Sequence, residues 1–438
     1  MTGSRDGLAV PAALAAVVFV ALAFGVAGAW ERSGEQVTDL ALYRAYGERI
    51  AAGDVPYRDF RFEYPPAALP LLVAPALTTS TRDGYRLVFG VLTALAGGIG
   101  VLAVAGVRRS LGYPRGETLG VLAALALAPL ALGALLLDRF DLVPALVAVV
   151  AVAAIARGRD RLGAVLLGLA IAVKLYPAVI LPLAVARAWR RGGRREAAVV
   201  AALAVGVAIA SYVPFAILAP EGVATSIGRQ LGRPLQIESL GSAILLGLHQ
   251  LTGMGLAWSS SNGSQNLNGG GALALAVVLS ATQIAALCWI WVRFARAPGD
   301  ASRFVIAAAA SVAAFVALGK VLSPQFLVWL LLLVPLATGL RLRLAGACYA
   351  IACVLTALWF PARYWQLVRE FDPLASWLVL GRDLSLVALL VVLAAPLARL
   401  PGVAATREEG RMDPAPTTAA RAHVQARSPS RGPRQGRT

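Results

Sequence analysis

Apolar residues dominate long stretches of this chain, and short polar segments separate the stretches. Runs of about 20 apolar residues are the signature of helices that cross a membrane. Continuous runs such as Val121–Leu137 lack the alternation of a β-barrel. We therefore predict an all-α polytopic membrane protein with a bundle of about 11–13 transmembrane or re-entrant helices. The predicted spans are Leu8–Trp30, Arg86–Val107, Leu119–Leu137, a segment returning to Arg157, Ala197–Leu218, Ala272–Val292, Phe304–Leu318, Phe326–Leu340, Leu344–Phe360 and Trp377–Ala398.

One further apolar stretch, Leu162–Ala186, has arginine clusters at both ends. Arginine flanks mark the cytoplasmic ends of spans, so both ends are expected on the same side. About 25 residues cannot cross twice, because each full span needs about 20. Pro177 disfavours helix at the residue before it. The sequence therefore predicts two short helices that meet at Lys174–Pro177, with Lys174 deep in the bundle and toward its outer half.

The arginine distribution also predicts orientation. It places both termini in the cytoplasm and two long polar segments outside, a first outer loop 31–85 and a second outer segment 219–270. The second segment contains the apolar stretch Leu240–Trp258, a candidate re-entrant helix, and a tip, Ser259–Gly271, that we expect to be a flexible polar loop. Residues 1–398 are thus expected to form one membrane-embedded domain, with short amphipathic helices in the first outer loop. Residues 399–438 are expected to form a basic, disordered cytoplasmic tail.

Composition agrees with this class. The chain is 58% hydrophobic and only 14% charged, whereas soluble domains carry roughly 25% charged residues. Its net charge of +17 lies mostly in short loops and the tail, so it indicates membrane lipids as partners rather than nucleic acid. Cys288, Cys348 and Cys353 all lie in apolar spans and lack the spacing of metal ligands.

The first outer loop is rich in carboxylates and aromatic rings. Eight of the 23 acidic residues of the chain fall between Glu31 and Asp83. Asp39 lies just beyond the first span and shares one face of a predicted short helix with Tyr43, and Gly53 ends that helix. Asp39 is our candidate catalytic residue. The alternative is that it only caps the helix.

A second cluster follows in the same loop. Glu63 and Tyr64 precede two prolines, and the second proline suits the first turn of a short helix over Ala67–Leu77. Tyr57 begins an alternating strip of charged and aromatic residues that leads to this cluster. Such a strip suits a sugar or a polar headgroup, so Tyr43, Tyr57, Glu63 and Tyr64 are candidate substrate-binding residues. The alternative is a solvated loop whose charges pair with one another.

The lysines form a third set. Lysine and arginine total 40, and only Lys174 and Lys320 are lysines. Both lie in apolar stretches, where charges are costly and usually functional, and a lysine ammonium is a compact point charge suited to phosphate. Arg139 offers a third cation, in a charged outer turn, and Gln325 lies with Lys320 in a polar break between two spans. All four are candidate substrate-binding residues, and the alternative for the lysines is snorkelling to the interface.

One carboxylate with several cations indicates a particular chemistry. Glycosidases usually need two carboxylates, because the leaving alcohol must be protonated. A sugar phosphate already has a good leaving group, so it needs one base for the acceptor hydroxyl and cations for the departing phosphate. We expect no organic cofactor and no required metal, although Asp39 with Glu63 could hold one. The sequence has no Walker loop, dinucleotide fingerprint or nucleophile elbow.

At these positions the chain resembles the actinobacterial polyprenol-phosphate-mannose-dependent α-1,2-mannosyltransferases, which belong to the GT-C class of integral-membrane glycosyltransferases. The resemblance extends in layout over about residues 8–398. Its motifs are Asp39 with Tyr43, Gly53–Tyr57, Glu63–Pro66, Lys174–Pro177 and Lys320–Gln325.

The resemblance implies a GT-C-type bundle and an inverting transfer from a polyprenyl-phosphate sugar to a glycolipid or lipoglycan acceptor at the outer face of the cell membrane. In that class an aspartate of the first outer loop acts as the base, and Asp39 matches it. Two alternatives stay open: a transferase that uses polyprenyl-phosphate arabinose, and a membrane transporter or lipid flippase, because intramembrane lysines and broken helices also suit transport. The oligomeric state is left open.

Overall fold

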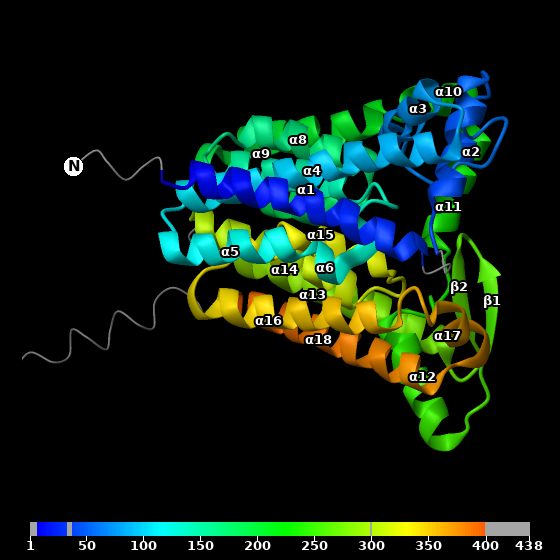
Figure 1. Cartoon of the computed structure of the whole chain (residues 1–438). Coiled ribbons are helices and arrows are strands. Elements are labelled where there is room, and N and C mark those ends of the chain that lie inside the picture. Colours follow the sequence, from blue (N-terminus) through cyan, green and yellow to red (C-terminus); the bar gives the residue numbers. More distant parts are fainter. Residues whose placement is uncertain (1–6, 33–36, 298–299, 399–438) are drawn as a thin grey trace, which may run out of the picture. The chain divides into compact units, whose positions relative to one another are not determined.

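Long helices run side by side in the bundle (Figure 1). The computed structural model describes residues 7–32, 37–297 and 300–398. Six helical segments of these residues are long and apolar enough to cross a membrane. They are α1 (Ala9–Arg32), α4 (Arg82–Ser110), α5 (Arg115–Leu127) with α6 (Pro129–Leu132) and the 3₁₀ turn Gly133–Leu136, α13 (Ala272–Arg296), α16 (Gly339–Trp359) and α18 (Pro373–Ala398). The prediction of an all-α polytopic membrane protein is confirmed.

The described residues also form five shorter apolar helical segments. They are the 3₁₀ turn Pro66–Ala68 with α3 (Leu69–Thr78), α7 (Leu142–Ala156), α12 (Leu240–Thr252), α14 (Ala301–Ala317), and α15 (Leu327–Leu331) with its flanking 3₁₀ turns Pro324–Phe326 and Val334–Leu336. The 17 residues of α14 rise about 25 Å, less than the membrane core. Nearly all its side chains from Phe304 onward are buried, because α7, α13 and α18 pack around it. A helix in that position need not match the lipid thickness.

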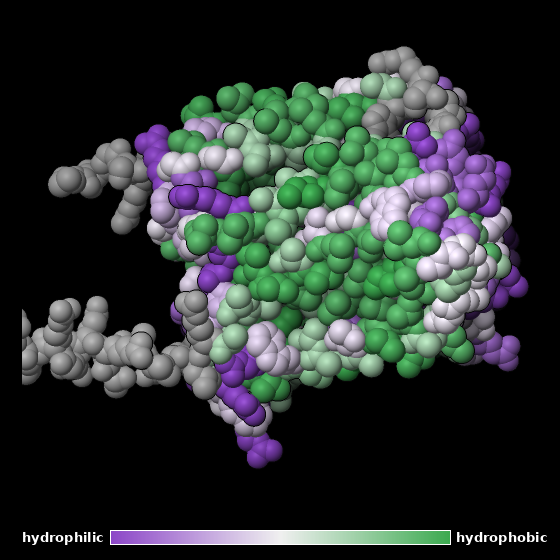
Figure 2. Space-filling model, turned by 90° about the horizontal axis from the view of Figure 1, so that it is seen from below, coloured by the Kyte–Doolittle hydropathy of each residue, from purple (hydrophilic) through white to green (hydrophobic). Residues whose placement is uncertain are grey.

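A hydrophobic belt covers the side of the bundle. Figure 2 shows it as a broad green band between two purple ends. Large apolar side chains on several helices point outward, among them Leu14, Leu95, Val277 and Leu358, each more than half exposed. Such a continuous apolar surface is rare on soluble proteins and is expected where lipid is the solvent.

The predicted break at Lys174 is confirmed. Helix α8 (Asp160–Val173) ends at Lys174, whose backbone is extended, and the 3₁₀ turn Tyr176–Ile180 leads into α9 (Leu181–Ala210). Helix α9 is itself two helices, because Gly193 interrupts it at φ 70° and ψ −166°. Only glycine adopts such a conformation readily. The chain therefore turns twice, and Lys174 lies at the first turn.

One of the two polar ends of the bundle carries most of the short elements, and we call it the site end. It holds α2 (Leu40–Ala51), α10 (Val213–Leu218), α11 (Pro220–Leu231), α17 (Tyr364–Glu370) and the strands β1 (Ala257–Ser261) and β2 (Ser264–Asn268) (Figure 1). The amphipathic α2 was expected in the first outer loop and is present. The predicted tail 399–438 lies outside the described residues.

The expectation of a flexible loop at Ser259–Gly271 is wrong. Strands β1 and β2 pair antiparallel from Ala257 opposite Asn268 to Ser261 opposite Ser264. Asn262 and Gly263 connect them with φ values of 51° and 71°, the positive angles of a two-residue hairpin turn that favours this dipeptide. The apolar stretch Leu240–Trp258 was expected to form one helix. It is helical only from Leu240 to Thr252, and Trp258 lies in β1.

Candidate active site

The turn before α2 brings a carboxylate against an arginine from a distant part of the chain. Asp39 occupies the N-cap position of α2, but its side chain makes no capping hydrogen bond. Its carboxylate forms an ion pair with Arg139, and the Tyr43 hydroxyl donates to it at 3.4 Å. The Asp39 side chain is 28% exposed, whereas that of Arg139 is 8% exposed. The Asp39 carboxylate is therefore accessible to a substrate, whereas the Arg139 side chain is buried.

Aromatic rings fix the helix that carries Asp39. The buried Tyr43 ring lies 5.7 Å from Tyr64, 5.4 Å from Phe89 and 5.5 Å from Phe140, centroid to centroid. Edge-on and tilted pairs at such separations are favourable. Phe140 adjoins Arg139 in the chain, so the same cluster orients both partners of the ion pair.

A second ion pair lies beside the first. The Lys174 ammonium is 2.6 Å from an oxygen of Asp141, whose side chain is 1% exposed. The indole N–H of Trp329 donates to the same oxygen at 2.5 Å, and the Tyr176 ring stacks on Trp329 at 4.2 Å. The ammonium also lies 4.8 Å above the Phe140 ring, a cation–π geometry. Lys174 is thus held in a cage of one carboxylate and aromatic walls.

One short turn connects the two ion pairs. Arg139 and Asp141 both lie between the 3₁₀ turn Gly133–Leu136 and α7, with the buried Phe140 between them. The turn therefore presents a cation toward Asp39 and an anion toward Lys174. The sequence signal for Asp141 was the charged turn itself, but spacing alone did not single it out from Asp138.

Lys320 lies in the break between α14 and the turn before α15. Its ammonium donates to the carbonyl oxygen of Leu231 at 3.0 Å, and its own carbonyl accepts from the Gln236 backbone N–H at 3.0 Å. Lys320 is thus tied to the linker Gly232–Ser239 that follows α11. Gln325 accepts from the Ser323 hydroxyl at 2.5 Å, which orders the same break.

The Glu63 cluster lies beneath the hairpin. A Cβ added to Gly263 at the hairpin tip would come within 2.8 Å of a carboxylate oxygen of Glu63. Helix α11 holds the strip from the side, because the Gln230 amide donates to the Glu63 carbonyl at 3.3 Å. Tyr57 is buried and its hydroxyl donates to the Tyr64 carbonyl at 2.5 Å. The structure therefore places Tyr57 as a support for Tyr64, with its hydroxyl already engaged.

A buried carboxylate lies deeper at the site end and was missed from the sequence. Glu238 is 1% exposed, and burial raises its pKa to about 7, against the opposing charges of Arg382, Arg139 and Arg233. The Gln236 amide donates to its side chain, and Arg382 donates to its backbone carbonyl at 2.6 Å. The signal that could have found this cluster is the charged pair Arg382–Asp383 inside an apolar span.

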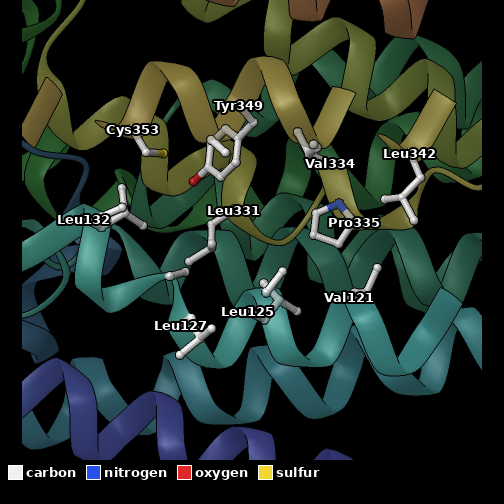
Figure 3. A pocket seen from close by; sticks show the side chains of 15 residues that line it. Val121, Leu125, Leu127, Leu132, Leu331, Val334, Pro335, Leu342, Tyr349 and Cys353 are labelled. Atoms are coloured by element: carbon white, nitrogen blue, oxygen red, sulfur yellow. The ribbon is translucent and has the colours of Figure 1, made fainter. Parts of the chain in front are cut away.

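An apolar groove enters the bundle from its side, with a volume of about 240 Å³. Helices α5 and α6 form one wall, and α15, its following turn and α16 form the other (Figure 3). The hydroxyl of Tyr349 in this groove donates to the Leu327 carbonyl, so it is satisfied. One wall ends at Leu132, which runs on into the turn that holds Arg139, and the other includes Leu331, two residues beyond Trp329.

The family model described as glycosyltransferase family 87 matches residues 62–324, more than half of the chain. The matched range contains Glu63, Arg139, Asp141, Lys174 and Lys320, whereas Asp39 precedes it. No curated protein matches the chain.

Proposed function

The chain belongs to glycosyltransferase family 87, and from this premise we propose that it transfers a sugar from a polyprenyl-phosphate donor to a glycolipid or another cell-envelope acceptor. The proposed sugar is mannose, and the proposed linkage is α-1,2 with inversion at the anomeric carbon. The observation that carries the proposal is the pair of adjacent ion pairs, Asp39 with Arg139 and Asp141 with Lys174, at one end of a membrane bundle.

Asp39 is the proposed base. Its carboxylate is partly exposed and is oriented by Tyr43 and Arg139. It takes the proton of the acceptor hydroxyl as that oxygen attacks the anomeric carbon. The bond between the anomeric carbon and the phosphate oxygen breaks in the same step, and its electron pair leaves with the polyprenyl phosphate.

Cations at the site end stabilise the leaving phosphate in this proposal. Arg139 and Lys174 are held in place before the substrate arrives, so little reorganisation accompanies the development of charge. Lys320 is a third contributor, because its ammonium meets only a backbone carbonyl among the described residues. The scheme requires no metal, since charge on the phosphate is met by side chains.

The donor's apolar tail is assigned to the groove between α5–α6 and α15–α16. The support is continuity: its walls run directly into Arg139 on one side and Trp329 on the other. A tail in this groove would leave the phosphate at the site end and the isoprenoid units in the belt of Figure 2.

We further propose that the site end faces outward and both termini face the cytoplasm. Arginines crowd the opposite end of the bundle, at the ends and turns of α4, α7–α8, α9 and α13, where Arg108, Arg157, Arg190 and Arg293 lie. An excess of arginine in short loops marks the cytoplasmic side.

The testing experiment uses purified protein in nanodiscs with radiolabelled polyprenyl-phosphate mannose and a membrane lipid extract. Wild type and Asp39→Ala are compared. Label that enters a new glycolipid only with wild type supports both the donor class and the base. If the wild type does not transfer mannose to any lipid, polyprenyl-phosphate arabinose is tested next as the donor. Labelled lipid that changes leaflet without a new glycosidic bond supports a flippase instead.

A further inference from the structure

Of the site-end cations Arg139, Lys174, Lys320 and Arg233, the first two have a carboxylate partner and the last two have none among the described residues. Arg139 pairs with Asp39, and Lys174 pairs with Asp141. Within the described residues, Lys320 contacts no carboxylate, and Arg233 forms neither an ion pair nor a hydrogen bond. Arg233 was not among the candidates found from the sequence, because it resembles any other loop arginine there.

The backbone places Arg233 beside Lys320. The Lys320 ammonium bonds the Leu231 carbonyl, and the Lys320 carbonyl accepts from the Gln236 N–H, each at 3.0 Å. Arg233 therefore lies in a short segment whose two ends are both fastened to Lys320. Strand β2 secures the other side, because the Leu267 N–H donates to the Leu235 carbonyl at 2.9 Å.

The Arg233 side chain is partly buried close to the charged groups of the site. Its Nε is buried and has no hydrogen-bond partner. The group lies within electrostatic range of Lys174, Glu63 and Glu238. Burial lowers the pKa of Arg233, although these two carboxylates oppose the shift.

Unpaired donors and neighbouring like charges are costly in a partly buried site. A bound anion would remove both costs. A guanidinium presents parallel N–H donors that match a phosphate, and a nearby ammonium adds a compact charge. Lys320 and Arg233 form no ion pair with a carboxylate among the described residues and share one fastened segment, so they resemble a prepared anion site.

We propose that Arg233, together with Lys320, binds the phosphate group of a lipid substrate. This inference rests on the proposed function in taking that lipid to be the polyprenyl-phosphate donor. In this arrangement Arg233 and Lys320 hold the phosphate on entry, while Arg139 and Lys174 keep their carboxylate partners and add positive charge nearby as the bond to the sugar breaks. Arg233 is then a binding residue that the donor meets on entry.

The experiment measures binding without turnover. Full-length protein in zwitterionic nanodiscs is titrated with polyprenyl phosphate, which carries no sugar, and in a separate arm with phosphatidic acid. Wild type is compared with Arg233→Ala, Arg233→Lys and the control Arg229→Ala, which changes an arginine four positions earlier at the end of α11. Thermal unfolding of each variant establishes that it is folded.

Loss of a charged hydrogen-bonded contact predicts about ten- to a hundredfold weaker polyprenyl phosphate binding in Arg233→Ala. Arg233→Lys retains the positive charge but not the parallel N–H donors of the guanidinium, so a smaller loss of affinity is expected. Arg229→Ala should bind as wild type does. Equal binding by wild type and a folded Arg233→Ala would overturn the inference.

The two arms separate this inference from the proposed function. Arg233-dependent binding of phosphatidic acid but not of polyprenyl phosphate supports the phosphate site and contradicts the donor assignment. If neither lipid binds to the wild type, the phosphate site is wrong, and sugar transfer from labelled donor then tests the function by itself.

Discussion

The buried pair Asp141–Lys174 allows stability and catalysis to be separated. Asp141→Asn removes the negative charge but keeps an oxygen that can accept from Trp329. The substitution leaves an ammonium without a counter-charge where side-chain exposures are 1% and 15%. Breaking a buried pair in this way costs about 3–5 kcal/mol, and the retained hydrogen bond favours the lower end, about 3 kcal/mol. Asp141 makes no capping hydrogen bond to α7, so loss of a helix cap does not contribute.

The assay is unfolding of purified protein in detergent, with sugar transfer measured on the same samples. Asp141→Asn should unfold at a lower temperature and lose activity. The double variant Asp141→Asn/Lys174→Met removes the uncompensated charge, so it should regain most of the stability and none of the activity. The control Asp54→Asn breaks an exposed pair with Arg49 and should change stability by less than about 1 kcal/mol.

Either of two results would refute this reasoning. A single variant as stable as wild type would mean that the ion pair contributes nothing to the fold. A double variant no more stable than the single would mean that the lost stability does not arise from the unpaired ammonium. Full transfer activity in the double variant would exclude Lys174 from the reaction.

Three further predictions follow from the site and the groove. Asp39→Asn should lower the rate of transfer about 10²–10⁴-fold with unchanged binding of polyprenyl phosphate, and full turnover by a folded variant would rule out Asp39 as the base. Because burial raises the pKa of Glu238 to about 7, its contribution favours folding at low pH and is lost as pH rises through about 7. Between pH 4.5 and about 7, the unfolding temperature should therefore fall less steeply in Glu238→Gln than in wild type or in the α11 control Glu221→Gln. Parallel profiles would show that Glu238 does not cause the pH dependence. Ala350→Trp fills the apolar groove and should raise KM for a long-chain donor but not for a short-chain donor, whereas equal effects on both would place the tail elsewhere.

Much of the membrane architecture follows from local pattern. Apolar runs near span length predicted α1, α4, α13 and α18 within a few residues at most boundaries. The break at Lys174 followed from arginine flanks and a proline, and both are local signals. The hairpin was mistaken for a flexible loop, because its Ser- and Asn-rich composition was given more weight than its Asn-Gly turn signal.

The site was only partly predictable. Lys174 and Lys320 stood out because charged residues are unusual in apolar stretches, and Asp39 stood out because it lies just beyond the first span. Arg233 did not, since one arginine in a chain with so many carries no signal until its neighbours are known. Glu238 was missed because it is buried against α18, whose Arg382 donates to its carbonyl from 144 positions later in the chain.

The sequence by itself determined the class of solvent that the chain must meet, the approximate spans, and which residues are costly to bury. These properties depend on side-chain hydrophobicity and charge, which act over a few turns of helix. Only the tertiary structure decided which charges neutralise one another. The partners Asp39 and Arg139 lie about 100 positions apart in the chain. Lys320 and its partner Leu231, beside Arg233, are separated by 89 positions. Electrostatic pairing depends on distances of a few ångströms, and the packing of the helices sets those distances.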